Sequence, residues 1–69
     1  TKNTVYIIEF KMNSVNSALN QIKNKKYFEP YLNTGKNIVC AGVAFDKEKR
    51  NISEYKALNL DELLSSEIN

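Results

Sequence analysis

The chain has 69 residues, of which 42% are hydrophobic, with a formal net charge of +2, one cysteine and no histidine. Chains of this length form one small domain and bury only about 60% of their unfolded surface. The single cysteine excludes an internal disulfide, and the absence of histidine excludes Ser-His-Asp catalysis and most zinc sites. No apolar run approaches the roughly 20 residues of a membrane span and no signal peptide is visible, so we expect a cytoplasmic location.

The first predicted element is an apolar strand over residues 5–11. Alternation of side chains places Glu9 and Lys11 together on one face, and Tyr6, Ile8 and Phe10 on the other. A carboxylate and an ammonium two residues apart at a strand end are typical of a nuclease metal site. The carboxylate can hold Mg²⁺, and the lysine can stabilise charge on a phosphate or orient the attacking water. The alternative is a structural ion pair, because Glu-x-Lys also occurs by chance.

The next predicted element is an amphipathic helix over about residues 15–28, with apolar residues at positions 15, 18, 19 and 22. Asn13 and Ser14 offer N-cap oxygens. The three lysines near its end are interpreted as a solvated face, with contact to a DNA backbone as the alternative. They are Lys23, Lys25 and Lys26. Pro30 predicts a break or a short extra turn over residues 29–32, and Gly35 is the expected left-handed residue of the following loop.

Residues 37–45 form a near-continuous apolar run, which suits a strand covered on both faces, as in a parallel sheet. Cys40 within it is interpreted as a small buried hydrophobe. A charged loop over residues 46–51 then leads to an antiparallel strand over residues 52–58. A short helix over residues 61–67 follows, with Asn59 or Asp61 near its cap. The predicted fold is therefore α/β, with the order β-α-β-β, a mixed sheet and a possible short C-terminal helix.

The charge is distributed unevenly along the chain. Residues 1–36 carry six lysines against two glutamates, whereas residues 37–69 carry four basic and six acidic side chains. Positive charge is thus concentrated around the first strand and helix. A solvated helix face would give the same asymmetry, and we treat it as weak support for a nucleic-acid partner.

The chain is expected to be a single partial domain, because it begins at Thr1 and its first strand follows almost at once. The first strand needs neighbours and its Ile8 and Phe10 need cover, which we expect upstream of Thr1. Exposed strand edges recruit other strands. We therefore expect a homodimer or strand exchange through an exposed sheet edge.

Several separated segments, in this order and spacing, resemble a PD-(D/E)XK nuclease-superfamily domain that follows an AAA-ATPase-like region in a group of bacterial proteins. The resemblance covers residues 5 to about 58. The segments are Tyr6-Ile7-Ile8-Glu9-Phe10-Lys11, Ala18-Leu19-Asn20-Gln21-Ile22-Lys23, Tyr27-Phe28-Glu29-Pro30-Tyr31, Val39 to Phe45 and Arg50-Asn51-Ile52.

This resemblance implies a restriction-endonuclease-like fold and a Mg²⁺-dependent phosphodiesterase site. Glu9 matches the second acidic metal ligand, Lys11 the motif lysine, and Gln21 a polar helix position that helps orient the site. Tyr27 follows Gln21 at a spacing of six, which departs from the Gln-x-x-x-Tyr of recombination-type relatives. The family's first acidic residue, an Asp on the preceding strand, has no counterpart here, so the chain as it stands is expected to be catalytically incomplete.

Two functions from different classes follow. The first is a metal-dependent nuclease domain, or its fragment, acting on nucleic acid, with DNA favoured over RNA. The second is a non-catalytic nuclease-fold interaction module of an ATPase-linked bacterial protein. An Asp roughly ten to twenty residues before Glu9, at the end of an apolar strand, would favour the enzyme.

Overall fold

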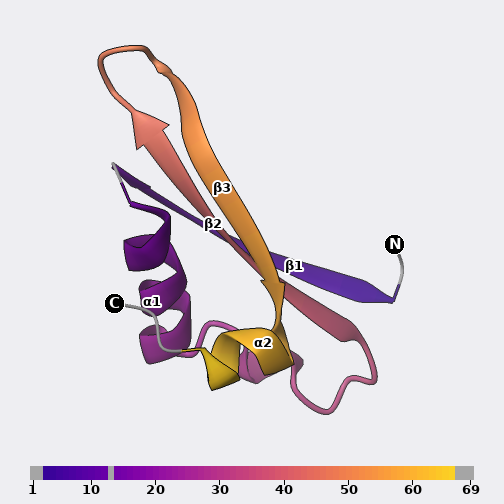
Figure 1. Cartoon of the computed structure of the whole chain (residues 1–69). Coiled ribbons are helices and arrows are strands. Elements are labelled where there is room, and N and C mark those ends of the chain that lie inside the picture. Colours follow the sequence, from indigo (N-terminus) through magenta and orange to yellow (C-terminus); the bar gives the residue numbers. More distant parts are fainter. Residues whose placement is uncertain (1–2, 13, 67–69) are drawn as a thin grey trace.

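The computed structural model describes residues 3–12 and 14–66, which form three strands and two α-helices (Figure 1). The predicted order of elements is confirmed. Neither helix has the length and hydropathy to cross a membrane. The elements, in chain order, are β1 (Thr4–Met12), α1 (Val15–Lys25), a 3-10 turn (Glu29–Tyr31), β2 (Asn37–Asp46), β3 (Asn51–Asn59) and α2 (Leu60–Ser65).

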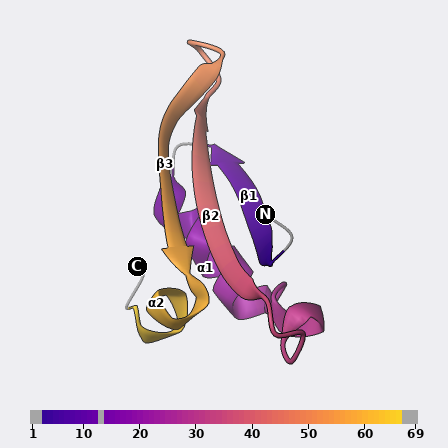
Figure 2. The same ribbon diagram turned by 90° about the vertical axis from the view of Figure 1, so that its right-hand side faces the viewer.

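The three strands form one mixed sheet in the order β1-β2-β3. β1 pairs with β2 in parallel, and β2 pairs with β3 antiparallel, as predicted. The register places Glu9 beside Gly42 and Lys11 beside Ala44. The hairpin that joins β2 to β3 projects beyond the end of β1 (Figure 2). Within the described ranges, β1 and β3 are the two edges of the sheet.

Helix α1 begins where the sequence predicts, at Val15, but it ends before the predicted residue 28. Ser14 is the N-cap, and its hydroxyl accepts a hydrogen bond from the Ser17 N–H at 3.0 Å. The other candidate cap, Asn13, lies outside the described residues. The helix stops at Lys25 because Lys26 adopts a left-handed conformation with φ 55° and donates its N–H to the Ile22 carbonyl. The predicted end at residue 28 is therefore wrong.

The chain after α1 turns back toward the sheet, and this turn buries Phe28. The 3-10 turn at Pro30 follows as expected, and Gly35 has the left-handed conformation predicted for it, with φ 76°. At the other end of the chain, Asn59 caps α2 in a reciprocal capping box with Glu62. Glu67, the last residue of the predicted C-terminal helix, lies outside the described residues.

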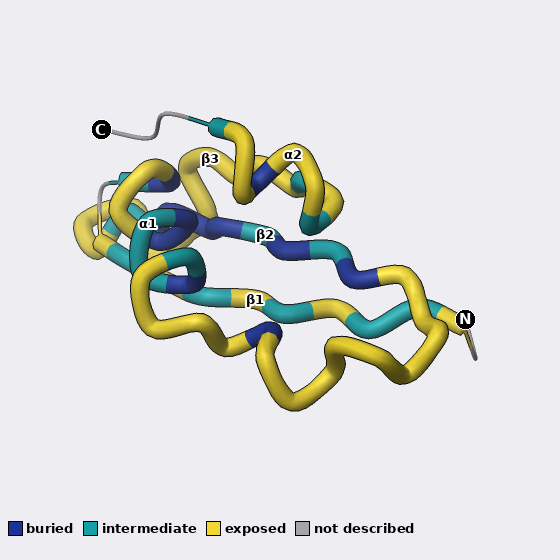
Figure 3. Tube along the Cα trace, turned by 90° about the horizontal axis from the view of Figure 1, so that it is seen from below, coloured by how far each residue is buried: buried dark blue, intermediate teal, exposed yellow. Residues whose placement is uncertain are grey.

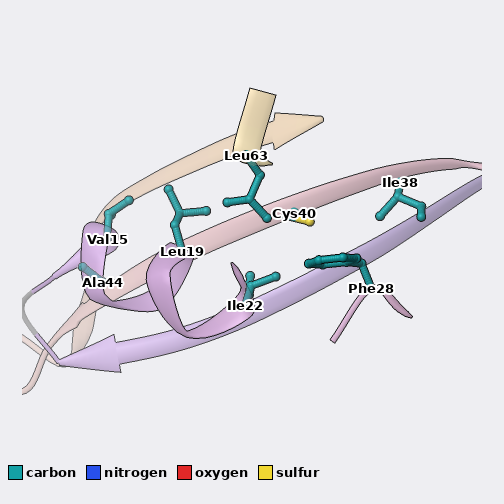
Figure 4. Packing of buried hydrophobic residues seen from close by; sticks show 8 residues of the cluster. All are labelled: Val15, Leu19, Ile22, Phe28, Ile38, Cys40, Ala44 and Leu63. Carbon is teal, nitrogen blue, oxygen red and sulfur yellow. The ribbon is translucent and has the colours of Figure 1, made fainter. Parts of the chain in front are cut away.

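The hydrophobic core lies between the sheet and the two helices (Figure 4). α1, α2, β2 and the turn after α1 all contribute, and the buried positions gather on β2 and the helix turns that face it (Figure 3). Cys40 is fully buried among apolar neighbours, which confirms its interpretation, and this burial raises the pKa of its thiol. The cluster comprises Val15, Leu19, Ile22, Phe28, Ile38, Cys40, Ala44 and Leu63.

Gly42, in the middle of β2, is the point of closest approach between α1 and the sheet. A Cβ atom there would lie 2.7 Å from the backbone oxygen of Val15, 3.0 Å from Leu19 Cγ and 3.1 Å from Ala18 Cβ. Glycine is therefore needed for space rather than for backbone freedom. Because Gly42 pairs with Glu9, α1 lies directly beside the candidate site.

The second face of the sheet carries no helix among the described residues, yet along β2 only Asn37 is exposed, and Val43 on this face is buried. Cover on both faces of β2 by further elements stays a prediction. Both helices pack on the face of Cys40, and the other face is lined by apolar and uncharged side chains. We call it the open face. A β-bulge after Ala44 keeps an apolar residue of β3 on this face. Its four rows across the sheet are Tyr6–Val39–Asn59, Ile8–Ala41–Ala57, Phe10–Val43–Tyr55 and Met12–Phe45–Ile52.

Candidate functional site

Glu9 and Lys11 lie together on the helix-covered face of β1, as the alternation predicts. Both are half-buried, whereas Ile8 and Phe10, on the opposite face, are exposed. Two residues of an extended strand span about 7 Å, so one ligand could contact both side chains. Within residues 3–12 and 14–66, neither side chain has a hydrogen-bond or ion-pair partner. Among these residues, the structure therefore contains no ion pair at Glu9 or Lys11.

The opposite charges nearest to this pair in the sheet register lie across the central strand. Lys56 shares a row with Glu9, and Glu54 shares a row with Lys11. Two strand spacings of about 4.8 Å separate the members of each row, and α1 packs over β2 between them. The three described strands therefore provide no partner that would neutralise Glu9 or Lys11.

Gln21 of α1 lies on the same side of the molecule as Lys11, and both line one groove. Its side-chain amide donates a hydrogen bond to the Tyr27 hydroxyl at 2.8 Å. The left-handed turn at Lys26 makes this contact possible at a spacing of six residues. Tyr27 is therefore tied to the site through Gln21, although its spacing departs from the pattern of recombination-type relatives.

This groove, which we call the amide groove, runs between the end of β1 and the polar side of α1. Its helix residues carry hydroxyl and amide groups at positions 17, 20, 21 and 24, one polar stripe at helical spacing. A lysine lies at each end, and no carboxylate lines it. The lining residues are Lys11, Met12, Ser17, Asn20, Gln21, Asn24 and Lys25. Glu9 is not among them; it lies two residues before Lys11 on the same face of β1.

The three lysines at the end of α1 have different surroundings. Lys23 donates a hydrogen bond of 2.7 Å to the Ser66 carbonyl and so connects α1 to the end of α2. Lys25 lines the amide groove. Lys26 is exposed at the left-handed cap. Of the three, only Lys25 is placed beside the candidate site.

A divalent metal ion would find one carboxylate here. Among the described residues, no three His, Cys, Asp or Glu side chains cluster in a way that could hold a metal ion. Glu9 fits as one oxygen ligand, but Mg²⁺ needs further oxygen ligands to complete its octahedral shell. A second groove, of about 550 Å³, lies at the far end of the sheet and contains none of Glu9, Lys11 and Gln21.

The fold and the site together define a class of protein. A parallel strand pair joined through a helix, with a carboxylate and a lysine two residues apart on the first strand, agrees with a nuclease-type α/β domain. The model of the PD-(D/E)XK nuclease superfamily matches residues 1–55, which is most of the chain, and the chain belongs to this superfamily. Its restriction-endonuclease-like fold, with a small mixed sheet and flanking helices, agrees with that membership. No curated protein and no solved structure matches the chain.

Sequence reasoning proposed Glu9, Lys11 and Gln21 as site residues, and it did not name the other residues that line the amide groove beside Lys11 and Gln21. Ser17, Asn20 and Asn24 carried a signal in their helical spacing beside the apolar stripe. Gly42 also carried one, because a glycine inside an apolar strand indicates close approach of another backbone.

Proposed function

We propose that the chain contributes part of a Mg²⁺-dependent nuclease site that hydrolyses phosphodiester bonds. One observation carries this proposal: Glu9 and Lys11 are half-buried, lie on one face and have no partner among residues 3–12 and 14–66, in a chain of a nuclease superfamily. Leaving a partly buried charge unpaired lowers stability, so such a pair is expected where a ligand completes it.

The three residues would divide the work by their chemistry. The Glu9 carboxylate would supply one oxygen ligand to the cation, and the Lys11 ammonium would pair with a phosphate oxygen as negative charge develops on it. The Gln21 amide would orient a polar group of the substrate, since Tyr27 fixes its rotamer. A bound divalent cation would neutralise phosphate charge and lower the pKa of an attacking water.

A second carboxylate is needed to hold that cation. We place it on a strand that pairs with the free edge of β1, because this edge adjoins Glu9 directly. Divalent metal ions are general among PD-(D/E)XK nucleases, and magnesium is proposed from the preference of that ion for carboxylate and phosphate oxygens. An AAA-ATPase-like region linked to this domain is likewise part of the proposal.

The amide groove supports a nucleic-acid ligand, with DNA favoured over RNA. Most protein–DNA hydrogen bonds go to phosphate and sugar, and lysine, serine and amide side chains are frequent donors. The groove offers these groups in one stripe from Lys11 to Lys25, with no carboxylate to repel a phosphate. The backbone of the substrate would therefore run along α1, away from the scissile phosphate at Lys11.

The binding step is tested by fluorescence anisotropy with a labelled DNA oligonucleotide, without metal, over a series of salt concentrations. Lys25→Glu should weaken binding and make the dependence of log K on log salt less steep by about one, because one phosphate contact is lost. Lys49→Glu, in the exposed turn between β2 and β3, carries the same charge change and should have a smaller effect. Equal effects of the two variants would show that the groove is not the binding surface.

The alternative is a nuclease-fold module without catalysis, which associates with protein or nucleic acid. The single carboxylate at the site among the described residues favours it. Cleavage assays separate the two functions: a chain lengthened upstream of Thr1 by its natural sequence should cut DNA or RNA with Mg²⁺, and Lys11→Ala should reduce turnover. A lengthened chain that neither binds Mg²⁺ nor cleaves would leave the interaction module.

Self-association is proposed as well. β1 is an edge strand among the described residues, and where the upstream strand does not pair with it, its free side can recruit a strand from a second chain as a homodimer or by strand exchange.

A further inference from the structure

The amide groove carries hydrogen-bonding groups that phosphate alone does not match. Its two lysines, Lys11 and Lys25, lie at its ends, and three side-chain amides lie between them. An amide presents an N–H donor beside a carbonyl acceptor, whereas an ionised phosphate oxygen only accepts hydrogen bonds. The carbonyl oxygens of the groove therefore need a ligand group that donates. The three amides belong to Asn20, Gln21 and Asn24.

Two of these amides have no partner in the described part of the chain. Gln21 donates to the Tyr27 hydroxyl at 2.8 Å. Within residues 3–12 and 14–66, by contrast, the side chains of Asn20 and Asn24 make no hydrogen bond. These two residues are four positions apart on α1, so they lie on one side of the helix, about 6 Å apart along its axis. The helix therefore offers two amides, each with a donor and an acceptor, in the same direction.

We propose that Asn20 and Asn24 recognise adenine bases by their major-groove edges, with α1 lying in the major groove of duplex DNA. Adenine presents an N6 donor beside an N7 acceptor there, which is the pattern that one amide matches with two hydrogen bonds. Guanine presents two acceptors, cytosine a donor, and thymine an acceptor and a methyl group. Adenine is therefore the base that satisfies both atoms of each amide. The inference rests on the proposed function, because it takes DNA as the ligand of the amide groove.

The length and packing of α1 suit this role. The major groove of DNA is about 12 Å wide and admits an α-helix. The polar stripe from position 17 to position 25 spans about 12 Å of the helix axis. The buried residues of α1 all lie on its other side, against the sheet, so the amide stripe is the side that can meet DNA. Lysines at the two ends would contact phosphates and position the helix, while the amides select the base.

Fluorescence anisotropy without metal tests the proposal with two labelled duplexes of the same alternating adenine–thymine sequence. In one of them 7-deazaadenine replaces every adenine, which removes the N7 acceptor and keeps Watson–Crick pairing. The 69-residue chain should bind the natural duplex about 5-fold more tightly or better, because each amide–adenine pair loses one of its two hydrogen bonds. Asn20→Ala and Asn24→Ala should each lower this ratio by about 2-fold or more.

Asn16→Ala is the matched control, because Asn16 is an exposed residue of α1 that does not line the groove. It should leave the ratio of the two affinities unchanged. Alanine is a better helix former than asparagine, so all three variants should keep their fold, which far-UV circular dichroism checks. The comparison of the two duplexes with the unchanged chain needs no variant at all.

The outcomes distinguish this inference from the proposed function. Equal binding of the two duplexes would overturn adenine recognition and leave the groove as a phosphate-binding surface. A ratio that stays the same in both Asn20→Ala and Asn24→Ala would also overturn it, and so would an equal loss in Asn16→Ala. If neither duplex binds at low salt, the nucleic-acid role of the groove fails, and the inference fails with it.

Discussion

Gly42→Ala probes the contact that sets α1 against the sheet beside Glu9. The added Cβ atom would lie 2.7 Å from the Val15 carbonyl oxygen, a backbone atom that a rotamer change cannot move, and 3.0 Å from Leu19 Cγ. α1 would therefore have to shift by several tenths of an ångström. Overpacking of this kind costs about 1–3 kcal/mol, and a backbone contact places it near the upper end.

Two terms set the net effect. Alanine has less conformational freedom than glycine in the unfolded chain, which stabilises the folded state by about 0.4–1 kcal/mol. We therefore expect Gly42→Ala to lower the free energy of unfolding by about 2 kcal/mol. A domain of this size loses about 4–8 °C in Tm for each kcal/mol, which predicts a fall of about 8–16 °C. Gly35→Ala is the matched comparison. A Cβ atom at position 35 would meet nothing within 4 Å, so the only cost is the left-handed backbone, with φ 76°. After the same entropy gain, this cost lowers the free energy of unfolding by about 1 kcal/mol.

Thermal and urea unfolding, followed by circular dichroism, measure both variants. All samples need the same low protein concentration, because dimer formation would raise the apparent stability. We expect Gly42→Ala to lose about twice the free energy of unfolding that Gly35→Ala loses. A Gly42→Ala chain as stable as the wild type, or one less affected than Gly35→Ala, would refute the close packing of α1 on β2.

Three further predictions concern the cap, the groove and the core. Asn59→Ala removes the capping box of α2 and should cost about 1 kcal/mol, a Tm fall of about 4–8 °C; an unchanged Tm would show that the cap is dispensable. Tyr27→Phe removes the acceptor for Gln21, so the side-chain amide resonances of Gln21 should shift in NMR spectra, while stability changes by less than about 0.5 kcal/mol. Unshifted amide resonances would contradict the hydrogen bond. Burial raises the pKa of the Cys40 thiol above its ordinary value of 9.0, so the folded chain favours the neutral thiol. The stability that comes from this preference is fully present below pH 9.0, and it is lost as the pH rises through the pKa of the folded state. Cys40→Ala should therefore lose less stability than the wild type between neutral and alkaline pH, and parallel curves would contradict this.

Much of the fold could be predicted because local pattern and tertiary structure agree. The alternation in β1 and the 15, 18, 19, 22 spacing in α1 both correspond to the faces that the structure buries. The end of α1 could not be predicted from propensity. Lysine is a good helix former, and only the need to bring Phe28 back to the core favours the left-handed turn at Lys26.

Which elements lie on the second face of β2 was also beyond the sequence. An apolar run such as Ile38–Val43 indicates that both faces avoid water, but it does not say whether a helix or a second chain provides the cover. The candidate site could likewise be predicted only in part. Glu9 and Lys11 follow from a local pattern, whereas their isolation from Glu54 and Lys56 depends on strand order and on the position of α1.

The central claim is that Glu9 binds a divalent metal ion in a nuclease-type site. The most direct test is isothermal titration of Mg²⁺ and Mn²⁺ into the chain lengthened upstream of Thr1 by its natural sequence, compared with Glu9→Ala. Glu54→Ala is the control, because it removes a carboxylate from the same face of the sheet across α1. We predict metal binding in the lengthened wild type and in Glu54→Ala, and its loss in Glu9→Ala. Equal binding by Glu9→Ala, or no binding by the lengthened wild type, would contradict the claim.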